Sequence, residues 1–223
     1  MRNLTFGIVS EGPTDFEMLS QLIQNILPGD HRFLPLQPDL SETEGFGAHG
    51  AGWKGVLSWC SSFDELNVLT YMSNVGIDVL IIHLDSDVSR EPEINCAKSC
   101  PDADLTVIEL EKKLSQLLNI NQIPNNLIFC IPSDNTEAWI LSAIDGENHH
   151  NPPFKYIECT HKPEYIIANK PYNLLKRKDG KPKKSQTVYR ENLIPKVIES
   201  WESIKNSCFQ AEKLNNRLLQ IPR

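Results

Sequence analysis

The sequence predicts an α/β protein: a mostly parallel sheet flanked by helices, followed by a mainly helical C-terminal extension. Three observations lead to this prediction. Short apolar runs alternate with stretches of helical period through about residue 145. Two of these runs, LTFGIVS and VLIIHL, are nearly all apolar, as expected for strands buried on both faces. Acidic residues follow both runs, where the strands of open α/β sheets form a ligand crevice.

The first predicted strand covers residues 4–10, and the first helix covers 14–27, where Pro28-Gly29 ends it. The remaining elements of this region alternate in the same way. In chain order they are a short strand at 33–36, a loop over 38–52, a helical stretch at 53–60, a strand at 77–84, an amphipathic helix at 104–118, a strand at 126–131 and a helix at 138–143. We therefore expect residues 1–145 to form one α/β domain.

The segment GENHHNPP, residues 146–153, interrupts this alternation. Beyond it the patterns are mainly helical, with a turn at Asp179-Gly180 and helices near 189–206 and 208–219. Residues 146–223 are therefore expected to form a basic, mainly helical extension.

Composition points to an ordinary globular protein of 223 residues, with 40% hydrophobic and 23% charged residues. The longest apolar run is well short of the roughly 18 residues that cross a membrane. The N-terminus lacks the apolar core of a signal peptide, so we expect a cytoplasmic protein. Cys60 and Cys130 lie in apolar segments, where a reduced, buried thiol is expected.

The net charge of −7 is unevenly distributed along the chain. Residues 162–190 hold nine Lys and Arg but two acidic residues, which makes this window +7 and the remainder −14. Such asymmetry indicates either a phosphate-facing surface or a solvated basic loop. The candidate nucleic-acid-binding residues are Lys176, Arg177, Lys178, Lys181, Lys183 and Lys184.

Two acidic motifs carry most of the functional information. Glu11 and Asp15 follow the first predicted strand, and Asp85 and Asp87 follow the strand at 77–84. Carboxylates gathered at one sheet edge repel one another unless a positive charge neutralises them. Hard oxygen ligands of this kind favour Mg²⁺ or Mn²⁺.

A glutamate after the first strand, followed later by Asp-x-Asp after another strand, resembles the Toprim fold of topoisomerases, primases and some nucleases. In that family these acids bind Mg²⁺. The resemblance covers about residues 4–145 and implies a metal-binding role for Glu11, Asp85 and Asp87.

Two further elements resemble the nuclease domain of overcoming-lysogenization-defect (OLD) nucleases. These enzymes add a second acid four residues after the glutamate, matched by Asp15, and a Ser-x-x-x-Glu element, matched by Ser133 and Glu137. OLD nucleases usually carry an ATPase domain, and no Walker-type GxxxxGK[ST] occurs here. The chain is more similar to small stand-alone bacterial Toprim proteins. The resemblance thus implies a separate ATPase partner and a role in anti-phage defence.

For the chemistry we expect two-metal phosphodiester hydrolysis, in which one ion activates water and the other stabilises the leaving oxygen. One ion would be held by Glu11, Asp85 and Asp87. The second would be held by Asp15 and Glu137, and Ser133 would either bind that ion directly or hydrogen-bond to one of its ligands. Either Lys183 or Lys184 would stabilise the transition state, and the sequence does not choose between them.

Simpler roles are also open. Asp15 and Glu137 each fall in the first turn of a predicted helix, where the helix dipole favours an acid. The leading hypothesis is a metal-dependent endonuclease acting on DNA or RNA. The alternative is a non-catalytic Toprim module that binds nucleic acid or a partner protein.

Overall fold

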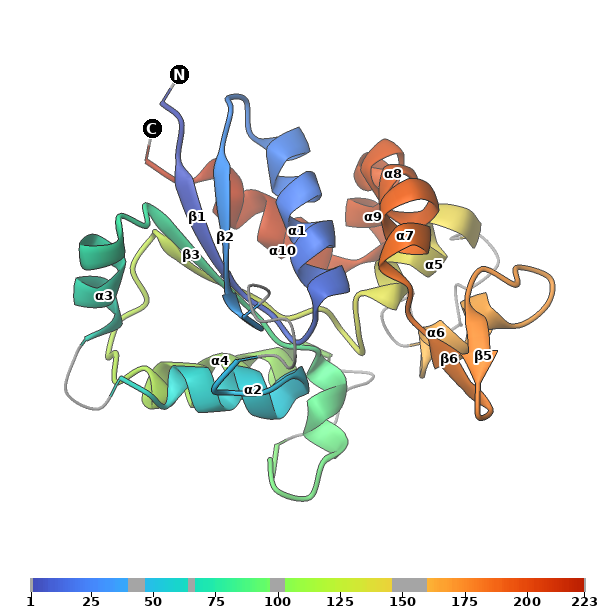
Figure 1. Cartoon of the computed structure of the whole chain (residues 1–223), viewed down its shortest axis with the longest axis horizontal. Coiled ribbons are helices and arrows are strands. Elements are labelled where there is room, and N and C mark those ends of the chain that lie inside the picture. The colour runs from blue at the N-terminus through green and yellow to red at the C-terminus, as the bar shows by residue number, and fades with distance from the viewer. Residues whose placement is uncertain (1, 40–46, 64–66, 97–102, 146–159, 223) are drawn as a thin grey trace.

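The computed structural model describes residues 2–39, 47–63, 67–96, 103–145 and 160–222. At its centre lies a four-stranded sheet in the order β2-β1-β3-β4, in which every pair of neighbours is parallel (Figure 1). The strands are β1 (Thr5–Val9), β2 (Arg32–Gln37), β3 (Val79–His83) and β4 (Leu127–Cys130). The predicted α/β class with a parallel sheet and flanking helices is confirmed, and all four predicted strands are present.

The three strands β1, β3 and β4 are buried on both faces. Ile8 pairs with Ile81 and Ile81 with Ile128, and all three belong to one hydrophobic cluster. Their neighbours Ile82 and Phe129 pair with each other and belong to a second cluster. Because successive side chains of a strand point to opposite faces, each apolar run supplies both clusters at once.

One face of the sheet is covered by α2 (Gly52–Cys60), α3 (Val68–Val75) and α4 (Ala103–Leu117), as Figure 1 shows. The helices α2 and α4 were predicted, but α3 was not. It is short and depends on local caps: the Asn67 side chain accepts a hydrogen bond from the Leu69 amide at 2.8 Å, and Gly76 ends the helix with φ 75°.

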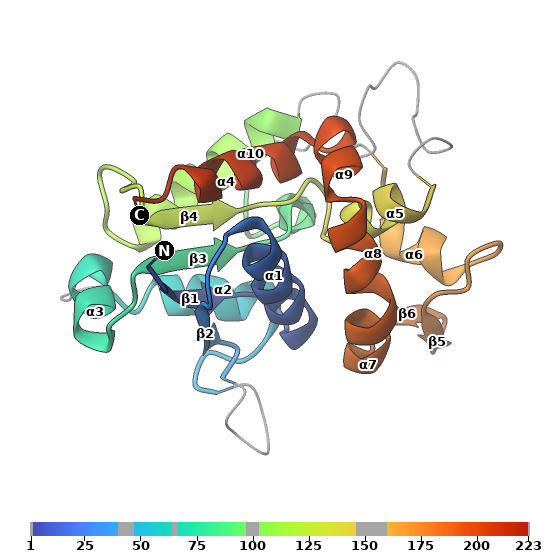
Figure 2. The ribbon, with the colours of Figure 1, turned by 90° about the horizontal axis from the view of Figure 1, so that it is seen from above.

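The other face is covered by α1 (Pro13–Ile26) together with α5 (Glu137–Asp145) and the C-terminal helices. These are α8 (Ile194–Glu199), α9 (Trp201–Ser207) and α10 (Phe209–Leu219). Figure 2 shows α10 beside β4, and α8 and α9 running past α1 and α5. The C-terminal region therefore completes the hydrophobic cluster to which α1 and α5 belong.

The helix predicted near 189–206 is divided into successive segments. A π-helical turn spans Tyr189–Leu193, α8 begins with Pro195 in its first turn, and Ser200 separates α8 from α9. The helix predicted at 208–219 is confirmed as α10.

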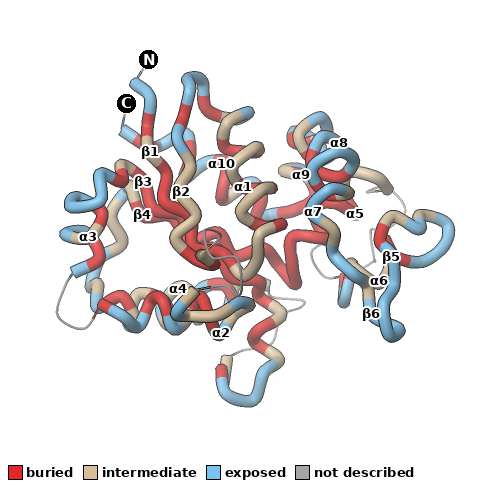
Figure 3. Tube along the Cα trace, viewed as in Figure 1, coloured by how far each residue is buried: buried red, intermediate tan, exposed pale blue. Residues whose placement is uncertain are grey.

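A basic hairpin lies between α6 (Pro163–Ala168) and the short α7 (Gln186–Val188). Its strands are β5 (Lys176–Lys178) and β6 (Lys181–Lys183), joined by the predicted turn at Asp179-Gly180. Both turn residues have positive φ, 52° and 77°, as a type I′ hairpin turn requires. Figure 3 shows that the hairpin is exposed, whereas the sheet is buried.

Cys60 and Cys130 are free and buried, as predicted. In the part of the chain that the structure describes, no helix is both long and apolar enough to cross a membrane.

Candidate functional site

The predicted acidic residues lie after the carboxyl ends of three adjacent strands. Glu11 follows β1 and Asp85 follows β3, and β1 and β3 are parallel neighbours. The element after β4 contributes Ser133 and then Glu137, the first residue of α5. Asp15 lies in the first turn of α1. The order of the strands therefore brings residues from distant parts of the chain to one edge of the sheet.

Glu11 and Asp85 are in direct contact. Glu11 Oε1 accepts a hydrogen bond from the Asp85 backbone amide at 2.8 Å. Burial, and then the neighbouring Asp85 carboxylate, raise the pKa of Glu11 well above its usual range. Within the described residues, the buried Asp85 Oδ1 has no hydrogen-bond partner. Without a nearby positive charge, Glu11 therefore favours its protonated form over a second carboxylate at this junction.

His83 lies beneath this junction, and the sequence analysis overlooked it. It is the last residue of β3 and has an exposed fraction of 0%. Its Nε2 lies 3.2 Å from Asp85 Oδ1, within ion-pair distance but without hydrogen-bond geometry. Burial opposes the charged imidazolium, yet Asp85 and the other carboxylates raise the pKa of His83 to about 9. The available signal was a histidine in an otherwise apolar strand, two residues before Asp85.

Asp15 and Glu137 form a second, differently compensated pair. Lys184 Nζ lies 2.8 Å from Glu137 Oε1 and 3.9 Å from Asp15 Oδ1. Thr136 Oγ1 donates to Asp15 Oδ1 at 3.1 Å, and the Tyr189 hydroxyl donates to Glu137 Oε1. Although burial opposes its charge, the carboxylates of Asp15 and Glu137 raise the pKa of Lys184 well above its usual range. One ammonium therefore pairs closely with Glu137 and partly offsets the charge of Asp15.

The structure thus separates the two lysines that the sequence left as alternatives. Lys184 contacts the acidic site, whereas Lys183 is an exposed residue of β6. Tyr189 was not predicted to take part. Burial, and then the Glu137 carboxylate, raise its pKa well above the usual range, so its hydroxyl remains a hydrogen-bond donor.

Asp87 and Ser133 lie farther along the same edge. Asp87 belongs to the 3₁₀ turn η1 (Ser86–Arg90), and its amide donates to the Asp134 carbonyl at 2.9 Å. Burial, and then Asp85 and Asp134, raise the pKa of Asp87 to about 7. Asp134 itself pairs with Arg90. Ser133 is buried beside it.

The donor chemistry of Glu11, Asp85 and Asp87 suits a hard divalent cation. In the described ranges, no three His, Cys, Asp or Glu side chains form a group that could hold a metal ion as they stand. A cation therefore requires these side chains to reorient.

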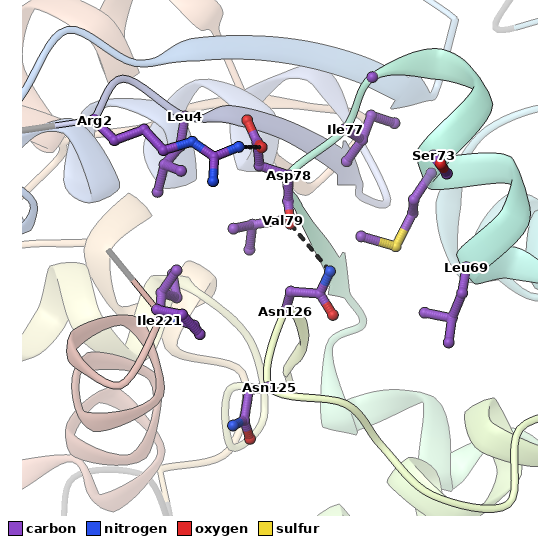
Figure 4. Close-up of a pocket in the computed structure, with 13 residues that line it drawn as sticks. Arg2, Leu4, Leu69, Ser73, Ile77, Asp78, Val79, Asn125, Asn126 and Ile221 are labelled. Carbon is purple, nitrogen blue, oxygen red and sulfur yellow. Dashed lines mark hydrogen bonds and ion pairs between the residues drawn. The ribbon is translucent and has the colours of Figure 1, made fainter.

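A cavity of about 620 Å³ lies at the opposite end of the sheet. Leu4 and Asp78, which precede β1 and β3, line it, and Asp78 pairs with Arg2 at 2.5 Å (Figure 4). This cavity lies at the amino ends of the strands and is separate from the acidic edge.

Comparison of the chain with protein-family models, with curated proteins and with solved structures finds no match. The functional proposal is therefore based on the residues of the site and on the resemblance of its motifs.

Proposed function

We propose that this protein is a divalent-metal-dependent nuclease that hydrolyses phosphodiester bonds in nucleic acid, as the Toprim resemblance implies. The observation that carries the proposal is the contact between Glu11 and Asp85 at the ends of two adjacent parallel strands. Desolvation and the Asp85 carboxylate disfavour ionisation of Glu11, as the raised pKa of Glu11 indicates. A bound cation would relieve this repulsion and keep both carboxylates ionised.

Glu11, Asp85 and Asp87 would hold the cation, either Mg²⁺ or Mn²⁺. The buried Asp85 Oδ1 lies 3.2 Å from His83 Nε2 but forms no hydrogen bond within the described residues, which leaves it able to take a ligand. When bound, the cation would activate a water molecule and stabilise the charge that develops on the phosphoryl oxygens. His83, beneath Asp85, would hold that carboxylate ionised and in place.

Lys184 leads us to revise the expected second metal. Its ammonium already pairs with Glu137 and lies 3.9 Å from Asp15, the two acids that the sequence had assigned to that ion. We therefore propose one cation and one lysine rather than two cations. The Lys184 side chain is 38% exposed, so a substrate could approach part of it. There it would stabilise a substrate phosphate as a point charge.

The test is cleavage of plasmid DNA and of structured RNA with Mg²⁺, with Mn²⁺ and with EDTA. We expect cleavage with a cation, and its loss in EDTA and in the variants Glu11→Gln and Asp85→Asn. Asp30→Asn, which removes an exposed acid after α1, is the matched control and should cleave normally. Cleavage that survives both Glu11→Gln and Asp85→Asn would contradict the proposed site.

The second candidate is a non-catalytic module that binds nucleic acid or a partner protein. The contacts of Asp15 and Glu137 with Lys184 favour it, because they supply a positive charge without a metal ion, although Glu137 Oε2 has no hydrogen-bond partner within the described residues. Binding of nucleic acid in EDTA, with no cleavage in either cation, would support this alternative. For the nuclease we further propose, from the resemblance, a cytoplasmic anti-phage role with a separate ATPase.

A further inference from the structure

The β5–β6 hairpin has two chemically different faces. Residues that pair directly across an antiparallel hairpin place their side chains on the same face, and the faces alternate along each strand. The pairs are Lys176 with Lys183, Arg177 with Pro182, and Lys178 with Lys181. Four lysines therefore share one face, here called the lysine face: Lys176, Lys178, Lys181 and Lys183.

The opposite face is anchored to the protein through Arg177. Its Nη1 donates to Asn169 Oδ1 at 3.0 Å, and its guanidinium carbon lies 5.9 Å from the centre of the Tyr165 ring in α6. Its Nε also donates to the Gly180 carbonyl at 3.2 Å, which ties it to the turn. Arg177 therefore fixes the orientation of the hairpin, and the lysine face points away from α6.

The lysine face is unpaired. All four lysines are exposed, and among the described residues none forms an ion pair or hydrogen bond with them. Like charges directly opposite each other destabilise a strand pair. This hairpin places two such lysine pairs on one face, so the lysines repel one another. Binding of a polyanion would relieve that repulsion.

The hairpin is connected directly to the acidic site. Lys184 directly follows β6, and its Nζ lies 2.8 Å from Glu137 Oε1. Figure 1 shows the hairpin beside α6, on the side of the molecule where α5 and α7 lie. The β6 end of the hairpin is therefore joined to the acidic site through Lys184.

We propose that the lysine face docks into the major groove of duplex DNA and binds the phosphates on its edges. This inference rests on the proposed nuclease function and names its substrate class. The major groove of B-DNA is about 12 Å wide and admits a two-stranded ribbon. The major groove of A-form RNA is deep and too narrow for side chains to read. A two-stranded ribbon of lysines therefore fits DNA duplexes better than RNA duplexes.

The inference divides the basic residues that the sequence grouped together. The four lysines of the lysine face contact phosphates, whereas Arg177 anchors the hairpin. Lys184 belongs to the acidic site.

The test is the salt dependence of binding to a fluorescent DNA duplex, measured by anisotropy in EDTA so that no cleavage occurs. The double variant Lys176→Gln/Lys183→Gln should reduce the slope of log K against log salt by about 1.8, because each phosphate contact contributes about 0.9. The matched control, Lys112→Gln/Lys196→Gln, removes the same charge from exposed positions on α4 and α8 and should keep the slope. Neutralising all four lysines of the face should reduce it by about 3.6.

Equal slopes in the hairpin variant and the control would overturn the inference. The inference would also be overturned if an RNA duplex bound as tightly as DNA and the lysine substitutions reduced its salt slope by the same amount. Glu11→Gln should bind DNA with the unchanged slope while losing cleavage, which keeps the two proposals distinguishable. Normal binding by the lysine variants together with loss of cleavage in Glu11→Gln would reject only the docking inference. Loss of binding by those variants without cleavage by the native protein would reject only the nuclease.

Discussion

The acidic site has two halves that use the same residue types in different electrostatic states. In the β1–β3 half, Glu11 and Asp85 are compensated from below by the buried His83. In the α5 half, Asp15 and Glu137 are compensated by Lys184, which is partly exposed and comes from the C-terminal region. The comparison teaches that the type of an acidic residue does not reveal whether it is available to a cation.

The difference has a simple physical origin. A buried carboxylate needs a positive charge or several hydrogen-bond donors to stay ionised. Glu137 has both, because Lys184 Nζ and the Tyr189 hydroxyl converge on its Oε1. Glu11 has the Asp85 amide but faces the Asp85 carboxylate, and its pKa rises. We therefore expect the β1–β3 half to bind the cation and the α5 half to hold the lysine.

The largest expected effect is on the affinity for Mn²⁺, and it tests whether the two halves differ in cation binding. Asp85→Asn should weaken Mn²⁺ binding by at least about a hundredfold. Replacing a residue that only hydrogen-bonds to a metal ligand already costs up to about that factor, and Asp85 is proposed as a ligand itself. Asp15→Asn should leave the affinity nearly unchanged, since Lys184 already satisfies that pair. Isothermal titration calorimetry on metal-free protein measures both. An equal loss in the two variants would show that the halves share the cation.

An intermediate effect is expected on stability in the α5 half. Lys184→Met should lower the free energy of unfolding by about 2 kcal/mol. Breaking a fully buried pair costs about 3–5 kcal/mol, and the Lys184 side chain is 38% exposed. Urea denaturation at neutral pH measures the change.

The neighbouring Lys183→Met is the matched control for this prediction. Lys183 is exposed in β6, so its removal should change the free energy of unfolding by less than about 0.5 kcal/mol. Adding Glu137→Gln to Lys184→Met should recover part of the loss, because Glu137 then carries no unpaired charge whereas Asp15 still lacks the ammonium. Equal stabilities of the two lysine variants would argue against a buried Lys184–Glu137 pair.

The smallest effect concerns Asp87, at the rim of the β1–β3 half. Its pKa rises from 3.8 to about 7 on folding, so the folded protein holds a proton between these values that the unfolded chain has released. The free energy of unfolding therefore falls as pH rises from about 4 to 7, and the full penalty remains above that window. Asp87→Asn removes this penalty.

The full pKa change would correspond to roughly 4 kcal/mol, but Asp87 is only half-buried, so solvent screens much of it. In EDTA, Asp87→Asn should thus melt about 2–4 °C above the native protein at pH 8, which corresponds to about 1 kcal/mol. Near pH 4 the two should melt together, because the native Asp87 is then protonated when folded. Scanning calorimetry across this range measures the difference. Asp30→Asn, an exposed position, serves as the control. A melting difference that does not change with pH would contradict the raised pKa of Asp87.

Local sequence patterns predicted much of the fold. The continuous apolar runs of β1, β3 and β4 were recognisable because both faces of these strands are buried. The helices α1, α2, α4 and α5 were recognisable from their helical period. The hairpin strands were not, since Lys has a low strand propensity and the hairpin is held by one turn and by Arg177. The sequence did place its turn at Asp179-Gly180.

The site was predictable in part for the same reason. Glu11, Asp85 and Glu137 follow recognisable strands, and parallel strands bring their ends to one edge. His83 was missed because nothing in a single strand shows that a histidine will lie beneath a carboxylate. Lys184 could not be separated from Lys183, because the two are adjacent in sequence and differ only in what the fold places beside them.

By itself, the sequence determined the parallel sheet, the positions of the acidic residues after its strands, and the basic character of residues 162–190. Only the tertiary structure decided which positively charged side chain compensates which acid. The C-terminal helices pack in the same hydrophobic cluster as α1 and α5, and in doing so they carry Lys184 and Tyr189 to Glu137. Apolar periodicity is local and can be recognised in the sequence, whereas compensation of a buried charge depends on contacts between distant segments.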